Sequence, residues 1–126
     1  MSYRPQSIYE IIGADAIHSL TDAFYAAVEK DPVLRCMYPD DLAEPRRHLQ
    51  LFLVQFFGGP RDYSAERGHP RLRMRHFPFA IDQQARDHWL RHMLAAIDSV
   101  DIGEPARSQM REYFDRSSEF LINRRD

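Results

Sequence analysis

Apolar residues recur every three or four positions in four long segments of this chain of 126 residues, which is the periodicity of α-helices with one buried face. These segments are residues 15–30, 43–57, 82–98 and 105–122. Residues that favour β-strands are scarce, with four valines and a single threonine. The pattern therefore predicts an all-α fold, and the length predicts one domain, residues 1–126.

Residues that stop or start helices separate these segments. A short first helix is expected to end at Gly13, and a second, longer helix follows from about Asp15. The segment 31–39 opens with Asp-Pro and closes with Tyr-Pro, which predicts a short turn. Asp82 is suited to cap the third long helix. Residues 58–70 contain three glycines and two prolines, so we expect them to form a loop.

Composition excludes several classes of protein. The formal net charge of −2 provides no basic excess for a phosphate backbone, so we expect no nucleic-acid partner. The single cysteine, Cys36, excludes an internal disulfide and any metal site built from several thiolates. No apolar run reaches membrane-spanning length, and the N-terminus lacks the apolar core of a signal peptide. We therefore expect a cytoplasmic protein with no membrane contact.

The stretch 68–79, GHPRLRMRHFPF, combines residues that could hold a haem. A neutral imidazole such as that of His76 is a good axial ligand for porphyrin iron. Three arginines alternate with Leu72 and Met74, and closely spaced guanidinium groups can meet the two carboxylates at the haem edge. The alternation also fits a short strand, and an arginine run is commonly a solvated face. Periodicity does not choose between a two-turn helix that ends at Pro78 and an extended segment.

Aromatic residues elsewhere suit the same pocket, although each also has a purely structural interpretation. Trp89 is the only tryptophan, and its indole N–H can donate either to a dioxygen ligand or to a backbone carbonyl of the core. Tyr25 lies at the margin of a buried helical face and Tyr38 at a corner of the chain. Leu49 and Phe52 share a bulky face that suits a flat apolar ring, and core packing explains that face equally well.

His88 and His92 lie one helical turn apart, which is a spacing that can bind zinc. No glutamate follows His88, so the pair is not part of an HExxH motif. The sequence shows no third ligand nearby, so we do not expect a zinc site here.

Several motifs together resemble the group II, or O type, truncated haemoglobins. They are the run 56–60 (FFGGP) followed by Tyr63, the run 68–76 (GHPRLRMRH), and Trp89 after an Arg-Asp pair. The resemblance implies a truncated globin fold, which is a two-over-two helical sandwich around haem. It also implies one haem b per chain with His76 as the proximal ligand. Trp89 would then be the characteristic distal donor.

The resemblance extends to the other cofactor contacts. It implies that Tyr38 packs on the haem and donates to the bound ligand, and it favours an inward hydroxyl for Tyr25. We expect Tyr63, His69 and Arg73 at the haem propionates. Two residues depart from the family pattern. Pro45 can donate nothing to a ligand, and His48 stands where arginine or lysine usually reaches a propionate, so its contact would depend on pH.

Three hypotheses for function follow. The first is reversible binding of dioxygen, carbon monoxide and nitric oxide, with slow oxygen release suited to sensing, storage or scavenging. The second is a haem oxidoreductase, either a nitric oxide dioxygenase or a peroxidase-like enzyme, that works with an unidentified reductase. The third is a cofactor-free helical interaction module. Either a monomer or a homodimer is compatible with the sequence.

Overall fold

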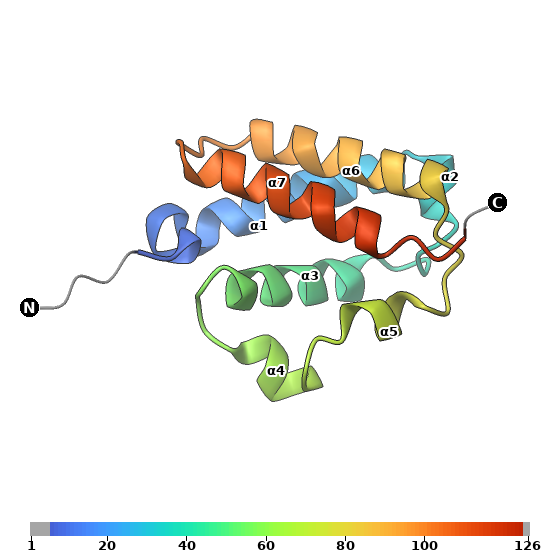
Figure 1. Cartoon of the computed structure of the whole chain (residues 1–126), viewed down its shortest axis with the longest axis horizontal. Coiled ribbons are helices and arrows are strands. Elements are labelled where there is room, and N and C mark those ends of the chain that lie inside the picture. The colour runs from blue at the N-terminus through green and yellow to red at the C-terminus, as the bar shows by residue number, and fades with distance from the viewer. Residues whose placement is uncertain (1–5, 125–126) are drawn as a thin grey trace, which may run out of the picture.

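The computed structural model describes residues 6–124 and contains, over that range, seven helices and no strand (Figure 1). The helices are α1 (Ile8–Glu29), α2 (Pro32–Arg35), α3 (Ala43–Phe56), α4 (Asp62–Arg67), α5 (Leu72–His76), α6 (Gln83–Asp98) and α7 (Ala106–Phe120). The predicted all-α class is confirmed. Every helix in the described range is too short or too polar to cross a membrane.

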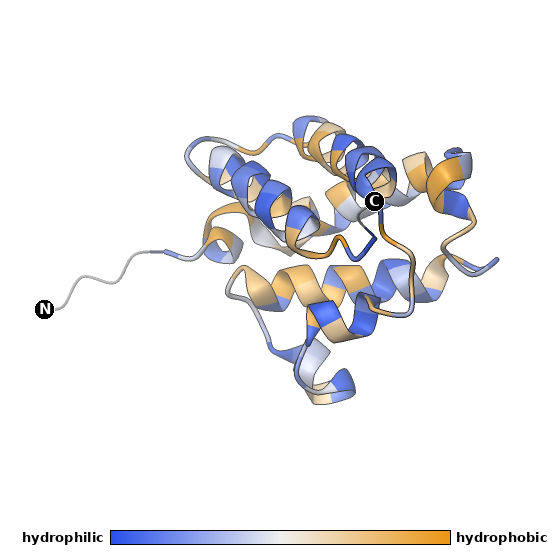
Figure 2. Cartoon of the chain, turned by 45° about the vertical axis from the view of Figure 1, so that its right-hand side comes forward, coloured by the Kyte–Doolittle hydropathy of each residue, from blue (hydrophilic) through white to orange (hydrophobic). Residues whose placement is uncertain are grey.

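The four long helices pack together around α1 and α6. Helix α1 contacts both α3 and α6, and α6 also contacts α7. Figure 1 shows α6 and α7 side by side above α3, with α1 behind them. Apolar and polar residues alternate along α3 in Figure 2, as expected of a helix with one buried face. The short helices α4 and α5 extend the α3 side of the molecule.

The core lies where α1 meets α6 and α7. The largest fully buried side chains come from the faces that the helical spacing predicted: Ile17, Leu20, Phe24, Val28, Leu53, Met93, Ile97, Met110 and Phe114. Their close packing holds the long helices rigidly together, so the side chains that project from them toward the α3 side have fixed positions.

The structure contains the helix-ending glycine and the helix-capping aspartate that the sequence predicted. Gly13 has a positive φ of 81° and a non-helical backbone, and it kinks α1 at the position where the sequence predicted a stop. The Asp82 side chain accepts a hydrogen bond of 2.8 Å from the N–H of Ala85 and caps α6. Segment 72–76 is the helix α5, which decides the question that periodicity left open.

The prediction that residues 58–70 form a loop was wrong, because six of them form α4. The amide of Gln55 in α3 holds this short helix. Its Oε1 accepts from the N–H of Ser64 at 2.9 Å, and its Nε2 donates to the Ser64 hydroxyl at 2.7 Å. The Tyr63 side chain is buried against the core. Contacts with the rest of the fold therefore stabilise a helix that is too short to show a periodic pattern.

Candidate functional site

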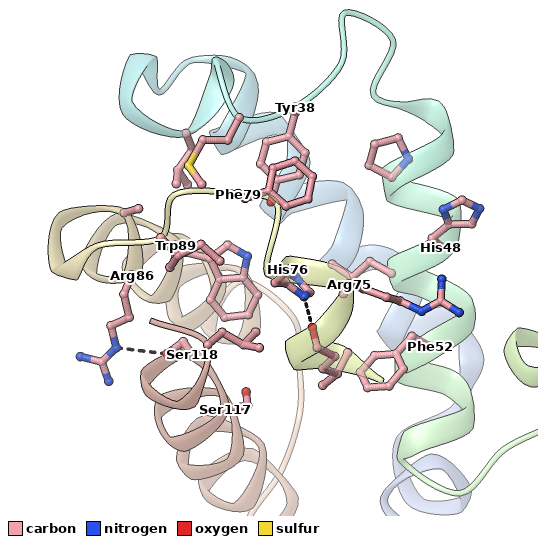
Figure 3. Close-up of a pocket in the computed structure, with 18 of the residues that line it drawn as sticks. Tyr38, His48, Phe52, Arg75, His76, Phe79, Arg86, Trp89, Ser117 and Ser118 are labelled. Carbon is pink, nitrogen blue, oxygen red and sulfur yellow. Dashed lines mark hydrogen bonds between the residues drawn. The ribbon is translucent and has the colours of Figure 1, made fainter. Parts of the chain in front are cut away.

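A cavity of about 550 Å³ lies between the α3 side of the molecule and α6. This is the size of a pocket for a small organic ligand or cofactor. Its walls are mostly apolar and come from every helix (Figure 3). The lining includes eight of the residues expected from the sequence: Tyr25, Tyr38, His48, Leu49, Phe52, Tyr63, His76 and Trp89.

His76 is the last residue of α5 and is half-buried in the cavity wall. Its Nδ1 lies 2.6 Å from the carbonyl oxygen of Leu72, one turn earlier (Figure 3). A carbonyl can only accept a hydrogen bond, so Nδ1 carries the proton and donates it. Nε2 then keeps its lone pair, which is the form in which a neutral imidazole binds a metal.

Three hydrogen-bond donors meet at another part of the wall. The Tyr38 hydroxyl accepts hydrogen bonds from the Trp89 indole and from the Tyr25 hydroxyl. Burial raises the pKa of Tyr38 to about 12, although these two hydrogen bonds oppose the shift. The pKa of Tyr25 is raised more than that of Tyr38, first by burial and second by the neighbouring Tyr38. Both tyrosines are therefore neutral near pH 7 and can donate.

Aromatic packing holds these donors in place. The ring of Tyr25 meets that of Tyr38 edge-on, with centroids 5.7 Å apart. Phe24, which is fully buried in α1, contacts Tyr25 at 5.1 Å and Trp89 at 5.3 Å between centroids. The rigid core thus fixes the directions in which the hydroxyl and indole groups point.

Positive charge gathers at the edge of the cavity formed by α3, α4 and α5. Arg75 donates from Nε to the carbonyl of Pro70 at 2.8 Å and from Nη2 to the carbonyl of Arg67 at 2.7 Å. Arg67 donates to Nδ1 of His48 at 2.9 Å, because a guanidinium can only donate. Burial and the charge of Arg67 lower the pKa of His48. Among the described residues, no carboxylate forms a salt bridge with Arg67 or Arg75.

A third arginine lies on another side of the cavity (Figure 3). Arg86 donates from Nε to the Ser118 hydroxyl at 3.1 Å and pairs with Asp115. Asp87 lies 3.5 Å from the same guanidinium. These carboxylates neutralise Arg86, so the available positive charge of the cavity is concentrated at Arg67 and Arg75.

Two residues expected at the site do not line this cavity. His69 and Arg73 face a separate shallow hollow beside Met74 and Phe120. His69 accepts a hydrogen bond of 3.2 Å from the N–H of Arg71, and the Arg73 guanidinium lies over the Phe120 ring, 5.2 Å from its centroid. The cavity is lined instead by Arg67, Arg75 and Arg86, of which only Arg75 belongs to the arginine run that the sequence singled out. In a helix, Arg73 and Arg75 flank the stripe of Leu72 and His76 from opposite sides, so spacing alone could not choose between them.

His88 and His92 lie outside the cavity, and the expectation that they have no third partner was wrong. Both contact the carboxylate of Asp31, which precedes them by more than fifty residues. Sequence spacing could not reveal this partner, because Asp31 lies between α1 and α2, far along the chain from α6.

Comparison with known proteins decides the family. Residues 7–123 match the family described as bacterial-like globin. Group 2 truncated hemoglobin YjbI of Bacillus subtilis is 37% identical over 115 residues, which cover 91% of this chain and 87% of that protein. The chain is a group II truncated haemoglobin. The resemblance inferred from the sequence is confirmed.

Solved truncated haemoglobins and related haemoglobins have the same fold as this one. The haemoglobin of Chloroflexus aurantiacus is 51% identical, with a TM-score of 0.94 over 95% of this chain and 100% of that one. The thermostable haemoglobin of Thermobifida fusca is 43% identical, with a TM-score of 0.93 over 96% and 100%. The truncated oxygen-avid haemoglobin of Bacillus subtilis is 36% identical, with a TM-score of 0.90 over 94% and 100%. The predicted truncated globin fold is confirmed, and membership of this family implies a haem cofactor and diatomic gas ligands.

Proposed function

We propose that Nε2 of His76 would bind the iron of one haem b held in the cavity of this truncated haemoglobin, and that the protein binds dioxygen, carbon monoxide and nitric oxide reversibly. When bound, the haem supplies the iron to which a diatomic ligand attaches. The hydrogen bond between Nδ1 of His76 and the Leu72 carbonyl is the main support for this proposal. It leaves the imidazole with one unprotonated nitrogen in the wall of a haem-sized apolar cavity.

The chemistry of the lining matches the cofactor. Leu49, Phe52 and Leu72 offer apolar surface to a flat ring and exclude water from it. Arg67 and Arg75 have no carboxylate partner among the described residues, so they are available to the propionates. We assign the propionates to this pair rather than to Arg73. Because the pKa of His48 is lowered, His48 contributes little positive charge near pH 7.

The donors at the other part of the wall would retain a bound dioxygen. Tyr38 can donate its hydroxyl proton to a ligand, and Tyr25 and Trp89, which here donate to the Tyr38 oxygen, would turn from it to donate to the ligand as well. Pro45 can donate nothing. A hydrogen bond to a charged acceptor contributes roughly 1.5–3 kcal/mol, and about 1.4 kcal/mol is a tenfold change in equilibrium. Two such bonds would slow oxygen release on the order of a hundredfold. Sensing, storage or scavenging therefore suits this protein better than rapid delivery, in line with the oxygen-avid relative from Bacillus subtilis.

A second candidate function is haem oxidoreduction with nitric oxide or peroxide. The contact between Tyr25, Tyr38 and Trp89 favours it, because phenol and indole rings can donate protons or electrons. This second function needs a reductase. It is tested by measuring the turnover of nitric oxide. Repeated consumption of nitric oxide by the oxygenated protein with a cellular reductant would support catalysis. A single stoichiometric reaction would support binding.

The binding function is tested by the rate of oxygen release. The oxygenated protein is mixed in a stopped-flow instrument with dithionite or excess carbon monoxide. We expect a release rate at least about a hundredfold below that of a haem protein without distal donors. Release as fast as from such a protein would contradict the proposed role of the three donors.

A further inference from the structure

The junction between α1 and α2 carries a polar cluster that the haem cavity does not use. Asp31 precedes α2 and is only 6% exposed. Its Oδ2 lies 2.8 Å from Nδ1 of His88 and 2.6 Å from Nε2 of His92, both on α6. Its Oδ1 accepts a hydrogen bond of 2.9 Å from the N–H of Val33. Two imidazoles from α6 therefore contact the same buried carboxylate.

The two histidines are held in register by their helix. They lie four residues apart on α6, so their side chains project from one face. The side chain of His88 is 24% exposed and that of His92 is 17% exposed, so both are partly shielded but still accessible to an ion. One ligand atom from each of the three residues lies within 4.8 Å of the others. The cluster thus presents two nitrogens and one oxygen toward a common point.

We propose that Asp31, His88 and His92 bind a zinc ion, with water completing its coordination. Zinc favours tetrahedral sites built from imidazole nitrogen and carboxylate oxygen, with bonds of about 2.0–2.2 Å. Such bonds place neighbouring ligand atoms roughly 3.3 Å apart. The present separations to Asp31 are those of hydrogen bonds. Binding zinc therefore requires Oδ2 of Asp31 to move about 0.5–0.7 Å away from each imidazole nitrogen, while the three ligand atoms, which now lie within 4.8 Å of one another, close around the ion. Each neutral imidazole then carries its proton on its other ring nitrogen.

Among the described residues, Arg91 is the arginine that forms an ion pair with Asp31, and its charge opposes a cation there. Its Nη2 lies 3.9 Å from Oδ2 of Asp31, but its side chain is 65% exposed and can turn into solvent. The proposal therefore predicts that Arg91→Gln strengthens zinc binding by several-fold. A cluster that serves only to clamp α6 to α2 would show no such gain.

The site is tested by calorimetric titration of the untagged, haem-loaded protein with zinc chloride, after removal of loosely bound metal with a chelator. We expect one zinc ion per chain and no comparable heat from magnesium, which prefers oxygen ligands. His88→Gln and His92→Gln should each weaken zinc binding by at least about tenfold. Absence of saturable zinc binding at millimolar concentration would overturn the proposal.

Two control variants separate this site from other zinc ligands. His18→Gln changes an exposed histidine of α1, and Cys36→Ser removes the exposed thiol. Both should bind zinc as the unmodified protein does. Undiminished binding by the double variant of His88 and His92 would overturn the assignment. If a histidine variant does not fold, zinc K-edge X-ray absorption of the unmodified complex should show two imidazole ligands, and a spectrum without imidazole would refute the site.

Discussion

Nδ1 of His76 lies 2.6 Å from the carbonyl oxygen of Leu72. The two residues are separated by one turn of α5, so the helix itself supplies the acceptor that orients the ring. A histidine with this hydrogen bond has a defined tautomer and a more basic second nitrogen. The same short helix brings Arg75 to the cavity edge, where the carbonyls of Pro70 and Arg67 hold its guanidinium. A single five-residue helix therefore combines the proposed iron ligand with a proposed propionate contact.

Trp89→Phe should speed oxygen release by about tenfold or more, because it removes one hydrogen-bond donor while preserving an aromatic ring next to Phe24. Stopped-flow measurement of oxygen dissociation provides the test. An unchanged rate would show that Trp89 contributes only packing.

Tyr38→Phe should also speed oxygen release by roughly tenfold, since it removes a donor together with the hydroxyl that accepts from Trp89 and Tyr25. Tyr113→Phe is the matched control, because Tyr113 stacks on Phe56 with centroids 4.2 Å apart and does not line the cavity. The control should release oxygen at the rate of the unmodified protein. Equal effects of the two substitutions would indicate a general loss of packing.

Arg67→Gln and Arg75→Gln should each accelerate haem loss by about fivefold, the equivalent of roughly 1 kcal/mol for a partly exposed charged hydrogen bond. Haem transfer to excess apomyoglobin measures this rate. Arg73→Gln serves as the control, because Arg73 lies outside the cavity. Faster haem loss from the Arg73 variant than from the other two would restore the assignment expected from the sequence.

Asp31→Asn should lower the free energy of unfolding at pH 7 by about 2 kcal/mol, measured by urea denaturation in the presence of a chelator. Burial alone would raise the pKa of Asp31, but hydrogen bonds from His88, His92 and the Val33 N–H outweigh it and hold that pKa well below the ordinary 3.8. Asp15→Asn, an exposed control on α1, should change stability by less than about 0.5 kcal/mol.

The stabilising effect of Asp31 has a defined dependence on pH. The folded chain binds a proton at Asp31 less readily than the unfolded chain does, so the stabilisation is complete above pH 3.8. It is lost as the pH falls through the lower pKa of the folded state. The stability difference between Asp31→Asn and the unmodified protein should therefore shrink below about pH 4. A difference that grows with acidity would contradict the depressed pKa.

The long helices could be predicted from the sequence because interactions between residues close together in the chain determine them. Periodic burial of α1, α3, α6 and α7, the kink at Gly13 and the cap at Asp82 depend on neighbours within a few residues. Five of the expected cavity residues come from these helices, and all five line the same space: Tyr25, His48, Leu49, Phe52 and Trp89.

The features that the sequence analysis missed depend on contacts between distant segments. Helix α4 forms because Gln55 bonds to Ser64 from another helix. Arg75, rather than Arg73, lines the cavity because carbonyls of the preceding loop fix its guanidinium. No spacing rule pairs Asp31 with two histidines on α6.

Titration of haemin into the haem-free protein and into His76→Ala is the most direct test of whether His76 binds the haem iron. We expect the unmodified protein to bind one haemin per chain with a sharp Soret band, and the variant to lose haemin to apomyoglobin at least about tenfold faster with an altered spectrum. Circular dichroism of both proteins checks that the variant is folded. Failure of the unmodified protein to bind haemin, or an unchanged spectrum and haem retention in the variant, would contradict the proposal that His76 holds the iron.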